Sequence, residues 1–564
     1  MSFADIVLID GEVHTVDNFS SVTQAIAISG NKILATGTTE DILKLRGKST
    51  QVIELNGRSV LPGINDSHAH ACAFGASLPP LELDVSFPKS KSISDVREIV
   101  KAACIEKGRG ELIVGNGWDL GYLAECAGTG RMPTRWDLDD VSPDNPVFLQ
   151  DFSRHLAWVN TRWLELSGVR EGDSVDPDGF IFTDPERGIT GLFAEGAQNI
   201  VLKALPQMTE ARRVAAITAS NQAFNQLGIT SYTEPGLGPG GFNLMGGAMS
   251  SRVLETYIDL VRSQALTTRV NVLWLPCDMA GSSKETAKNL ADLVLPTEVD
   301  PQRLRVLGGK VFADGIPPNK TAWMKEEYVG GGFGSLCVHG DNDHERSIEL
   351  TEMIRLIHEA GLQAGVHVTG DAGIDAVIDG FEAAVAGFPR RDSRHYLIHG
   401  DFVSKEALRR LGEGGFGVNM NPGIKTAISD LMDEMLGEAK SSEQWPVRSA
   451  IEAGVQVCSS SDAPVTKPDW RVAVSAMLLR ESQASGKVSG PNERVDLDSA
   501  LRAYTMAPAW QDFAENWKGS IEPGKVADLC VMGESLRQSD AHSIPEIPID
   551  MTVFDGKVVF DRKA

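Results

Sequence analysis

The chain has 564 residues and a formal net charge of −24, from 53 lysine and arginine against 77 aspartate and glutamate residues. This charge opposes binding to nucleic acid and to anionic membrane surfaces. With 42% apolar and 23% charged residues, the composition is that of an ordinary globular protein.

Cysteine usage and the first residues both bear on the compartment. The seven cysteines are scattered and include no Cys-x-x-Cys pair, so a disulfide framework or a thiolate metal site is not expected. The start, "MSFADIVLIDGEVHTVD", lacks a basic segment followed by an apolar one, and no run of about 18 apolar residues predicts a membrane helix. We therefore expect a cytoplasmic protein without a nucleic-acid or membrane partner.

Both ends of the sequence are rich in short strands. Residues 3 to 60 alternate Val- and Ile-rich runs with Asp-Gly, Gly-Asn and Asn-Gly pairs, the pattern of β-hairpins. The stretches "GSIEPGKVADLCVM" and "MTVFDGKVVFD" near the other end have the same character. We predict one composite β-sandwich domain from residues 1–60 and 515–564, with residues 61–514 as a second domain between them.

Helices and strands alternate through the middle of the chain, as in "SIELTEMIRLIHEAGLQAGVHVTGDAGIDAVIDGFEAAV". This pattern predicts a parallel sheet with helices on its outside. Eight strands are expected, near residues 60–68, 229–234, 269–276, 304–310, 362–367, 395–399, 415–419 and 455–461. Eight is the number that closes a (β/α)8 barrel. Residues 71–220 are too long for one crossover and are expected to be an insertion that shapes the substrate pocket.

Polar side chains follow several of these strands at the end where a barrel carries its active site. They are His68 and His70, Lys310, His367, His399 and Asp462. Taken singly, each histidine could be a structural group and the lysine a solvated one. Together they place four imidazoles and a carboxylate at one rim, and both are good ligands for zinc and similar divalent ions.

The order of these residues resembles that of the amidohydrolase superfamily of metal-dependent hydrolases. "VLPGINDSHAH" and "GSIEPGKVADL" look like two of its characteristic stretches. "KVFADG", "HVTGDAG", "SSSDAPV" and "RHLAWVNTRWLELSGV" resemble the amidohydrolase-3 branch, which includes N-substituted formamide deformylases. One departure is "IHGD" around His399, where relatives commonly have Glu before the histidine and Ala after it.

The resemblance implies two divalent ions per chain, with zinc expected first and iron or manganese as alternatives. It also implies a carbamylated Lys310, because an ammonium cannot coordinate a cation whereas a carbamate can bridge two. A single metal beside an unmodified Lys310 is the alternative. A metal-activated hydroxide would attack a carbonyl, and Asp462 would act as general acid and base in hydrolysis of a non-peptide C–N bond.

Other functions remain open at this point. The same ligands would serve an ester or lactone hydrolase, or a deaminase, and a non-catalytic metal-binding regulatory protein is the alternative of another class. We expect a small-molecule substrate and a homo-oligomer, most simply a dimer. Trp118 and His155, both in the insertion, are candidates for substrate contact, with packing inside the insertion as the alternative for each.

Overall fold

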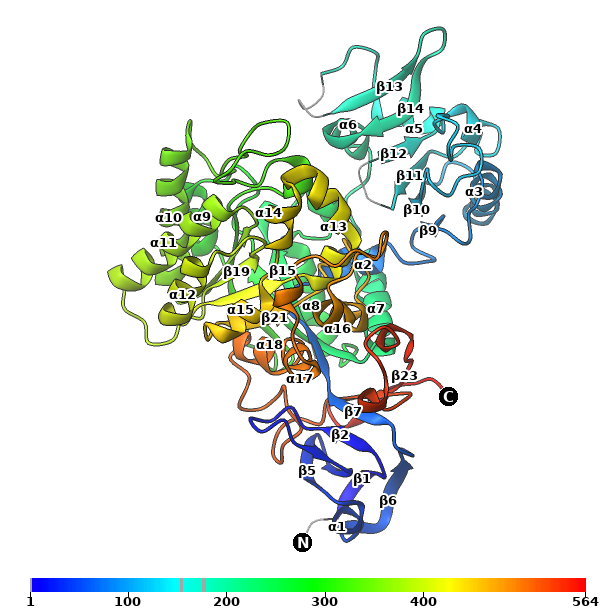
Figure 1. The fold of residues 1–564 in the computed structure, drawn as a ribbon. Coiled ribbons are helices and arrows are strands. Elements are labelled where there is room, and N and C mark those ends of the chain that lie inside the picture. The colour runs from blue at the N-terminus through cyan, green and yellow to red at the C-terminus, as the bar shows by residue number, and fades with distance from the viewer. Residues whose placement is uncertain (1–2, 153–155, 175–178) are drawn as a thin grey trace. The chain divides into compact units, whose positions relative to one another are not determined.

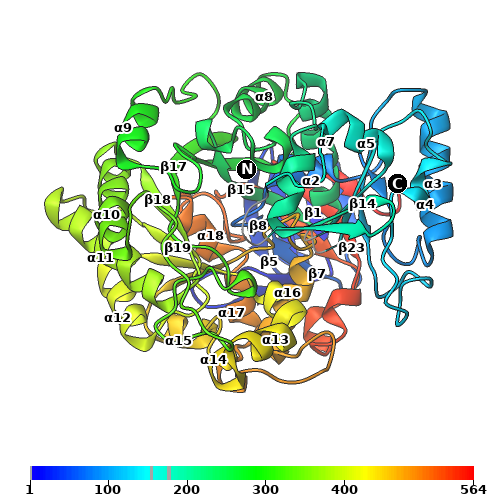
Figure 2. The ribbon, with the colours of Figure 1, turned by 90° about the horizontal axis from the view of Figure 1, so that it is seen from above.

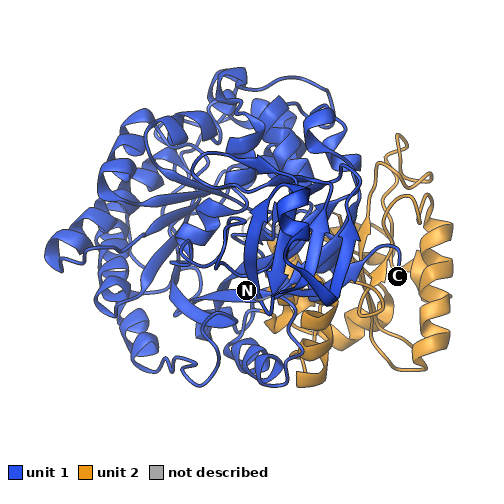
Figure 3. Ribbon diagram, turned by 90° about the horizontal axis from the view of Figure 1, so that it is seen from below, with its two compact units in different colours: residues 1–71, 221–244, 249–564 blue, residues 72–220, 245–248 orange. Residues whose placement is uncertain are grey.

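The computed structural model describes residues 3–152, 156–174 and 179–564 (Figure 1). The chain divides into two compact units (Figure 3). Unit 1 comprises residues 1–71, 221–244 and 249–564, and unit 2 comprises residues 72–220 and 245–248. No helix in the described ranges is long and apolar enough to cross a membrane.

Eight parallel strands form the central sheet of unit 1, each hydrogen-bonded to the next in sequence order (Figure 2). A (β/α)8 barrel was predicted, and the structure has a nearly closed, eight-stranded parallel barrel sheet. Every predicted strand region contains an observed strand. The strands are β8 (Ile64–Asp66), β15 (Ile229–Leu237), β16 (Arg269–Trp274), β17 (Leu304–Phe312), β18 (Gln363–Val368), β19 (Tyr396–His399), β20 (Gly417–Met420) and β21 (Gln456–Ser459).

Helices follow most of these strands and lie outside the sheet (Figure 2). Helix α12 (Lys405–Gly414) shows why they form: the Ser404 side chain accepts a hydrogen bond from Ala407 N at its start, and left-handed Gly415 ends it. Its buried face carries Leu408 and Leu411, spaced three residues apart as one helix face requires. The other helices between barrel strands include α8 (Ser251–Arg262), α9 (Ser283–Ala291), α10 (Asp343–Glu359), α11 (Asp371–Gly387), α13 (Pro422–Leu436) and α15 (Val447–Glu452).

The first predicted strand, residues 60–68, is two strands that belong to different sheets. Strand β7 (Ser59–Pro62) pairs with β22 (Leu529–Met532) from the far end of the sequence, and only β8 enters the barrel. The chain passes from one sheet to the other at Gly63, where a Cβ atom would lie 2.1 Å from Thr230 Oγ1. His68 and His70 therefore lie on the loop after β8, and not on a strand.

Strands from both ends of the chain form two further sheets of unit 1 (Figure 1). One has the order β5-β4-β1-β6 and the other β24-β23-β22-β7-β2-β3. Apolar side chains of both sheets, among them Leu8, Ile26, Val60 and Leu529, share one buried cluster. The strands are β1 (Ala4–Ile9), β2 (Glu12–His14), β3 (Val22–Thr23), β4 (Ala25–Ser29), β5 (Lys32–Gly37), β6 (Arg46–Glu54), β23 (Ile549–Phe554) and β24 (Lys557–Asp561).

The prediction that all three Gly-containing turns near the N-terminus close hairpins is wrong for two of them. Gly30-Asn31 joins the antiparallel pair β4 and β5 as expected. Asp10-Gly11 and Asn56-Gly57 instead carry the chain from the first terminal sheet to the second. Asp10 and Asn56 have φ near +57° and +52°, so these residues do make the tight turns that their types favour, but with partners in another sheet.

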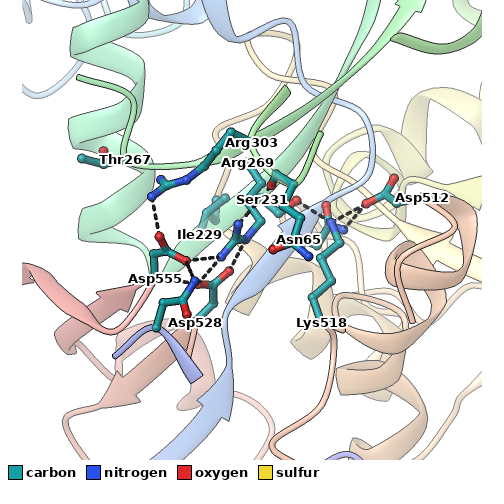
Figure 4. A network of polar contacts seen from close by, with 12 residues as sticks. Asn65, Ile229, Ser231, Thr267, Arg269, Arg303, Asp512, Lys518, Asp528 and Asp555 are labelled. Atoms are coloured by element: carbon teal, nitrogen blue, oxygen red, sulfur yellow. Dashed lines mark hydrogen bonds and ion pairs between the residues drawn. The ribbon is translucent and has the colours of Figure 1, made fainter. Parts of the chain in front are cut away.

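Buried charges link the sheet that contains β22, β23 and β24 to the barrel within unit 1 (Figure 4). Arg269, the first residue of β16, donates two hydrogen bonds to Asp528, from Nε at 2.7 Å and from Nη2 at 3.1 Å. Its Nη2 also donates to Asp555 in the turn between β23 and β24, at 3.0 Å. Arg269 is 2% exposed, so this cluster is shielded from water.

Unit 2 has a sheet and a core of its own. Its strand order is β13-β14-β12-β11-β10-β9. Two of its strands are β10 (Ile113–Trp118) and β11 (Val147–Asp151), which pair in parallel. The remaining strands are β9 (Leu83–Asp84), β12 (Leu156–Val159), β13 (Phe180–Asp184) and β14 (Gly188–Ala194), and the longest helix within residues 72–200 is α3 (Ile93–Lys107).

Candidate metal centre

Backbone hydrogen bonds hold the His68–His70 loop against the segment that carries Asp462. Asp462 N donates to His68 O at 2.9 Å, and His70 N donates to Ala463 O at 2.8 Å. Asp462 Oδ1 lies 3.3 Å from His68 Nε2 and 3.6 Å from His70 Nε2. The ligand atoms of these three side chains all lie within 4.8 Å of one another, so they form one cluster of donors.

Asp66, the last residue of β8, accepts hydrogen bonds from both segments that carry this cluster. Its carboxylate accepts hydrogen bonds from Ser461 Oγ at 2.6 Å, Ser461 N at 3.1 Å and His68 N at 3.3 Å. Burial raises the pKa of Asp66 to about 7. Asp66 joins the end of the first barrel strand to the end of the eighth, which brings His68 and Asp462 together.

His367 and His399 complete a group of four imidazoles. The His399 ring centroid lies 4.7 Å from that of His367 and 5.1 Å from that of His68. His399 has φ of +72° and Asp462 has φ of +55°, left-handed conformations that are uncommon outside glycine. Such backbone strain is found most often at functional sites, where the surrounding structure holds it in place.

Burial keeps the four histidines neutral, which is the form that binds metal. It lowers the pKa of all four imidazoles, to about 3 for His70. His367 Nε2 lies 3.2 Å from Gly315 O. Because a carbonyl only accepts, this nitrogen carries the proton and Nδ1 of His367 is left with a free lone pair.

Lys310 lies on β17 and is 1% exposed. Burial lowers its pKa to about 7, with Asp462 acting in the opposite direction. Its Nζ lies 4.9 Å from the Phe312 ring centroid, and no described residue accepts a hydrogen bond from it. A buried ammonium without an acceptor is costly, so the surroundings of Lys310 favour an uncharged amine or a modified side chain.

The residues present fit a divalent ion. Four neutral imidazoles and a carboxylate are the donor types that zinc prefers. His68 Nδ1 and His70 Nδ1 are buried without a hydrogen-bond partner in the part of the chain that the structure describes. His70 Nδ1 lies 3.9 Å from Oε1 of Glu234, a fully buried residue of β15. The Glu234 carboxylate also accepts a hydrogen bond from Tyr257 OH.

The six predicted metal residues thus come from the ends of barrel strands one, four, five, six and eight, and their assignment as ligands stays a prediction. Trp118 is fully buried in the core of unit 2, where its Nε1 donates to Leu149 O at 3.1 Å. These contacts favour the packing interpretation left open for Trp118. His155 lies outside the described residues. Asp66 and Glu234 were missed, although Asp66 ends the observed strand β8 and Glu234 is the last residue of the predicted strand 229–234.

Comparison with known proteins gives concordant results. The profile of the amidohydrolase family matches residues 51–560. An N-substituted formamide deformylase of Arthrobacter pascens is 26% identical over 578 residues, which cover 99% of this chain and 98% of that protein. An uncharacterized metal-dependent hydrolase from Pyrococcus furiosus superposes with a TM-score of 0.71 at 26% identity, covering 93% of this chain and 98% of that chain. One from Pyrococcus horikoshii OT3 shares the fold with a TM-score of 0.72 at 23% identity.

Proposed function

Because the chain belongs to the amidohydrolase family, we propose that it is a metal-dependent hydrolase of a non-peptide C–N bond in an N-substituted amide such as a formamide. The observation that carries this proposal is the position of Asp462, 3.3 Å and 3.6 Å from the Nε2 atoms of two neutral imidazoles. The relative named as a formamide deformylase supports the substrate class, since it aligns over 99% of this chain.

His68, His70, His367, His399 and Asp462 would hold the metal, with zinc as the first expectation. When bound, the metal supplies a Lewis acid that polarises the substrate carbonyl and lowers the pKa of water. Carbamylated Lys310 would be the ligand that allows a second ion to bind beside the first. Its pKa of about 7 supports this step, because the unprotonated amine is the form that adds carbon dioxide. A single ion beside unmodified Lys310 remains the alternative.

Asp462 would move the proton. The four histidines are poor bases here, because burial lowers the pKa of each, and in the proposed site their free lone pairs face the metal. Asp462 is anchored through its backbone to the His68 loop, which fixes where its carboxylate lies. It would take a proton from the attacking water and deliver it to the leaving nitrogen, the two roles of a general base and a general acid.

A substrate panel tests the proposed function. The purified full chain, loaded with Zn²⁺, is assayed against N-substituted formamides, longer amides, carbamates, esters and lactones, by release of the amine, alcohol or acid. We expect amide turnover that is lost on chelation and restored by metal. Turnover of esters or lactones alone would assign the related hydrolase chemistry instead. Stoichiometric metal without turnover of any class would favour a regulatory protein.

A further inference from the structure

A continuous row of buried hydrogen bonds crosses the barrel rim from the residue before His68 to His399. Its side chains belong to the ends of strands β8, β20, β21 and β19, and the four non-histidine members are at most 1% exposed. In order from one end, the row consists of Ser67, Asn419, Ser460, Asn421 and His399. Asn419 lies on β20 (Gly417–Met420), and Asn421 follows the last residue of that strand.

Each link in the row is within hydrogen-bond distance. Ser67 Oγ lies 2.8 Å from Ser459 O and 2.8 Å from Asn419 Nδ2. Ser460 Oγ lies 2.6 Å from Asn419 Oδ1 and 3.0 Å from Asn421 Nδ2. The row ends where Asn421 Oδ1 lies 2.8 Å from His399 Nδ1.

Backbone carbonyls fix the direction of every bond in this row, since a carbonyl oxygen only accepts. The Ser67 hydroxyl must donate to Ser459 O, so it accepts from the amide nitrogen of Asn419. The Asn419 oxygen then accepts from Ser460 Oγ, and that hydroxyl accepts from Asn421 Nδ2. Asn421 Nδ2 also donates to Ser460 O at 3.2 Å, which independently orients the Asn421 amide.

The orientation of Asn421 settles the state of His399. With its nitrogen toward Ser460, Asn421 presents an oxygen to His399 Nδ1, and this oxygen can only accept. We propose that Asn421 is a positioning residue that holds His399 in its Nδ1-protonated tautomer and thereby directs the Nε2 lone pair to the metal centre. In metal sites the partner of the second ring nitrogen ordinarily sets ring orientation and tautomer in this way.

The local geometry of Asn421 supports this role. Asn421 is the N-cap residue of α13, where asparagine usually accepts from a backbone N–H of the first turn. Its side chain makes no such bond and faces His399 and Ser460 instead. His399 is also held through its backbone, because Trp445 Nε1 donates to His399 O at 2.8 Å. The strained backbone and the ring of His399 are therefore fixed from two sides.

The first test is the tautomer of His399 in the metal-free, full-length protein, read by NMR of ¹⁵N-labelled histidines and assigned with the His399→Gln variant. We expect the Nδ1-protonated form in the wild type and in Asn421→Asp, which keeps an acceptor toward the ring. Asn421→Leu removes that acceptor, and we expect His399 to revert toward the Nε2-protonated form that predominates in free histidine. Should Asn421→Leu not fold, the shorter Asn421→Ser removes the same acceptor.

The second test is the affinity for Zn²⁺, measured by competition with a chromophoric chelator. Loss of a partner behind a metal-bound histidine typically weakens metal binding about 10- to 100-fold, and we expect that loss in Asn421→Leu with substantial recovery in Asn421→Asp. Asn225→Leu is the matched control, because Asn225 is also a buried, hydrogen-bonded asparagine of unit 1, bonded to Ile229 O and Thr267.

The two readouts separate this inference from the function on which it rests. A wild type that binds no Zn²⁺ refutes the proposed function, while the tautomer in the metal-free protein still decides the role of Asn421. If Asn421→Leu keeps the wild-type tautomer and binds Zn²⁺ as tightly as Asn225→Leu does, Asn421 is only a structural residue and the inference is wrong.

Discussion

Among single residues, Asp462 is the one on which the proposed chemistry depends most. In Asp462→Asn the amide oxygen can still face the ion, but it cannot take a proton near neutral pH. With four histidines and Lys310 in place, we expect much of the metal to be retained. General acid–base catalysis contributes about 10² to 10⁴-fold in rate, and a loss of that order is expected, mainly in kcat because the substrate pocket is untouched.

Metal content and steady-state kinetics of the same preparation check this prediction for Asp462. A variant that binds metal normally and turns over within a few-fold of the wild type would assign the proton transfer to another group. Loss of the metal itself would show that Asp462 acts chiefly as a ligand.

Lys310 is predicted to matter for metal binding as well as for turnover. Lys310→Ala removes the bridging group, so metal and activity should be lost together, and a short carboxylic acid such as acetate should restore part of both. Lys425→Ala is the matched control: Lys425 is also buried, and burial also lowers its pKa to about 7. Its Nζ donates to Ser441 O at 3.1 Å, so its loss should leave the metal content unchanged. Full metal content in Lys310→Ala would remove the bridging hypothesis.

The residues that could be predicted from sequence are those whose chemical type is unusual at a strand end. Histidines and a lysine after apolar runs stand out, and the structure brings them to one rim. Asp66 and Asn421 do not stand out, because aspartate and asparagine after a strand are also the commonest turn and cap residues. Only their contacts, with Ser461 and with His399, separate the two roles.

At the scale of secondary structure, the break at Gly63 shows that an apolar run does not specify which sheet its residues join. "SVLPGIND" is apolar on both sides of the glycine, so its pattern predicts one strand and does not record that the two halves pair in different sheets. The Asp-Gly and Asn-Gly turns are similar: their residue types specify a turn conformation, but the partner of the next strand is decided by packing between the sheets.

The Gly63 break also yields a stability prediction. In Gly63→Ala the new methyl would lie 2.1 Å from Thr230 Oγ1 and 3.0 Å from Asp528 Cβ. Overpacking of this kind typically costs about 1–3 kcal/mol, and we expect the free energy of unfolding of unit 1 to fall by that amount. Gly387→Ala, at the end of α11 where no atom lies within 4 Å of the new Cβ, is the control and should be neutral or slightly stabilising. Equal urea midpoints for the two variants would show that Thr230 moves aside at no cost.

Buried Arg269 connects barrel strand β16 to the C-terminal strands, which lie far from it in the sequence (Figure 4). Arg269→Met removes the side chain that donates two hydrogen bonds to the carboxylate of Asp528, which is 7% exposed. Breaking a buried pair from one side costs about 3–5 kcal/mol, and that loss in the free energy of unfolding is expected by urea denaturation. The exposed pair of Arg448 and Glu452 is the comparison. There, Arg448→Met should leave the free energy of unfolding nearly unchanged, because the pair is exposed to water. An equally small effect of Arg269→Met would mean that water replaces the arginine.

At the scale of the whole chain, all six predicted metal residues belong to unit 1, while unit 2 has its own sheet and its own buried clusters around Trp158 and Trp163. A ligand that binds only the folded state stabilises by RT ln(1 + [L]/Kd), about 4 kcal/mol when the free metal is 1,000-fold above Kd. Since the metal would contact unit 1 alone, its removal should weaken unit 1 and leave the intrinsic stability of unit 2 unchanged.

Amide hydrogen exchange read by mass spectrometry resolves the two units within one sample. After removal of metal by a chelator, peptides from residues 250–564 should exchange faster, and most of all those that contain His367, His399 and Asp462. Peptides from residues 80–150 should keep their rates, and readdition of Zn²⁺ should restore the first group only. The Asp462→Asn variant, which is expected to keep much of its metal, should follow the wild type in this experiment although it lacks activity. Equal loss of protection in both units would mean that they unfold as one cooperative body, and no change in either would contradict a metal site in the barrel.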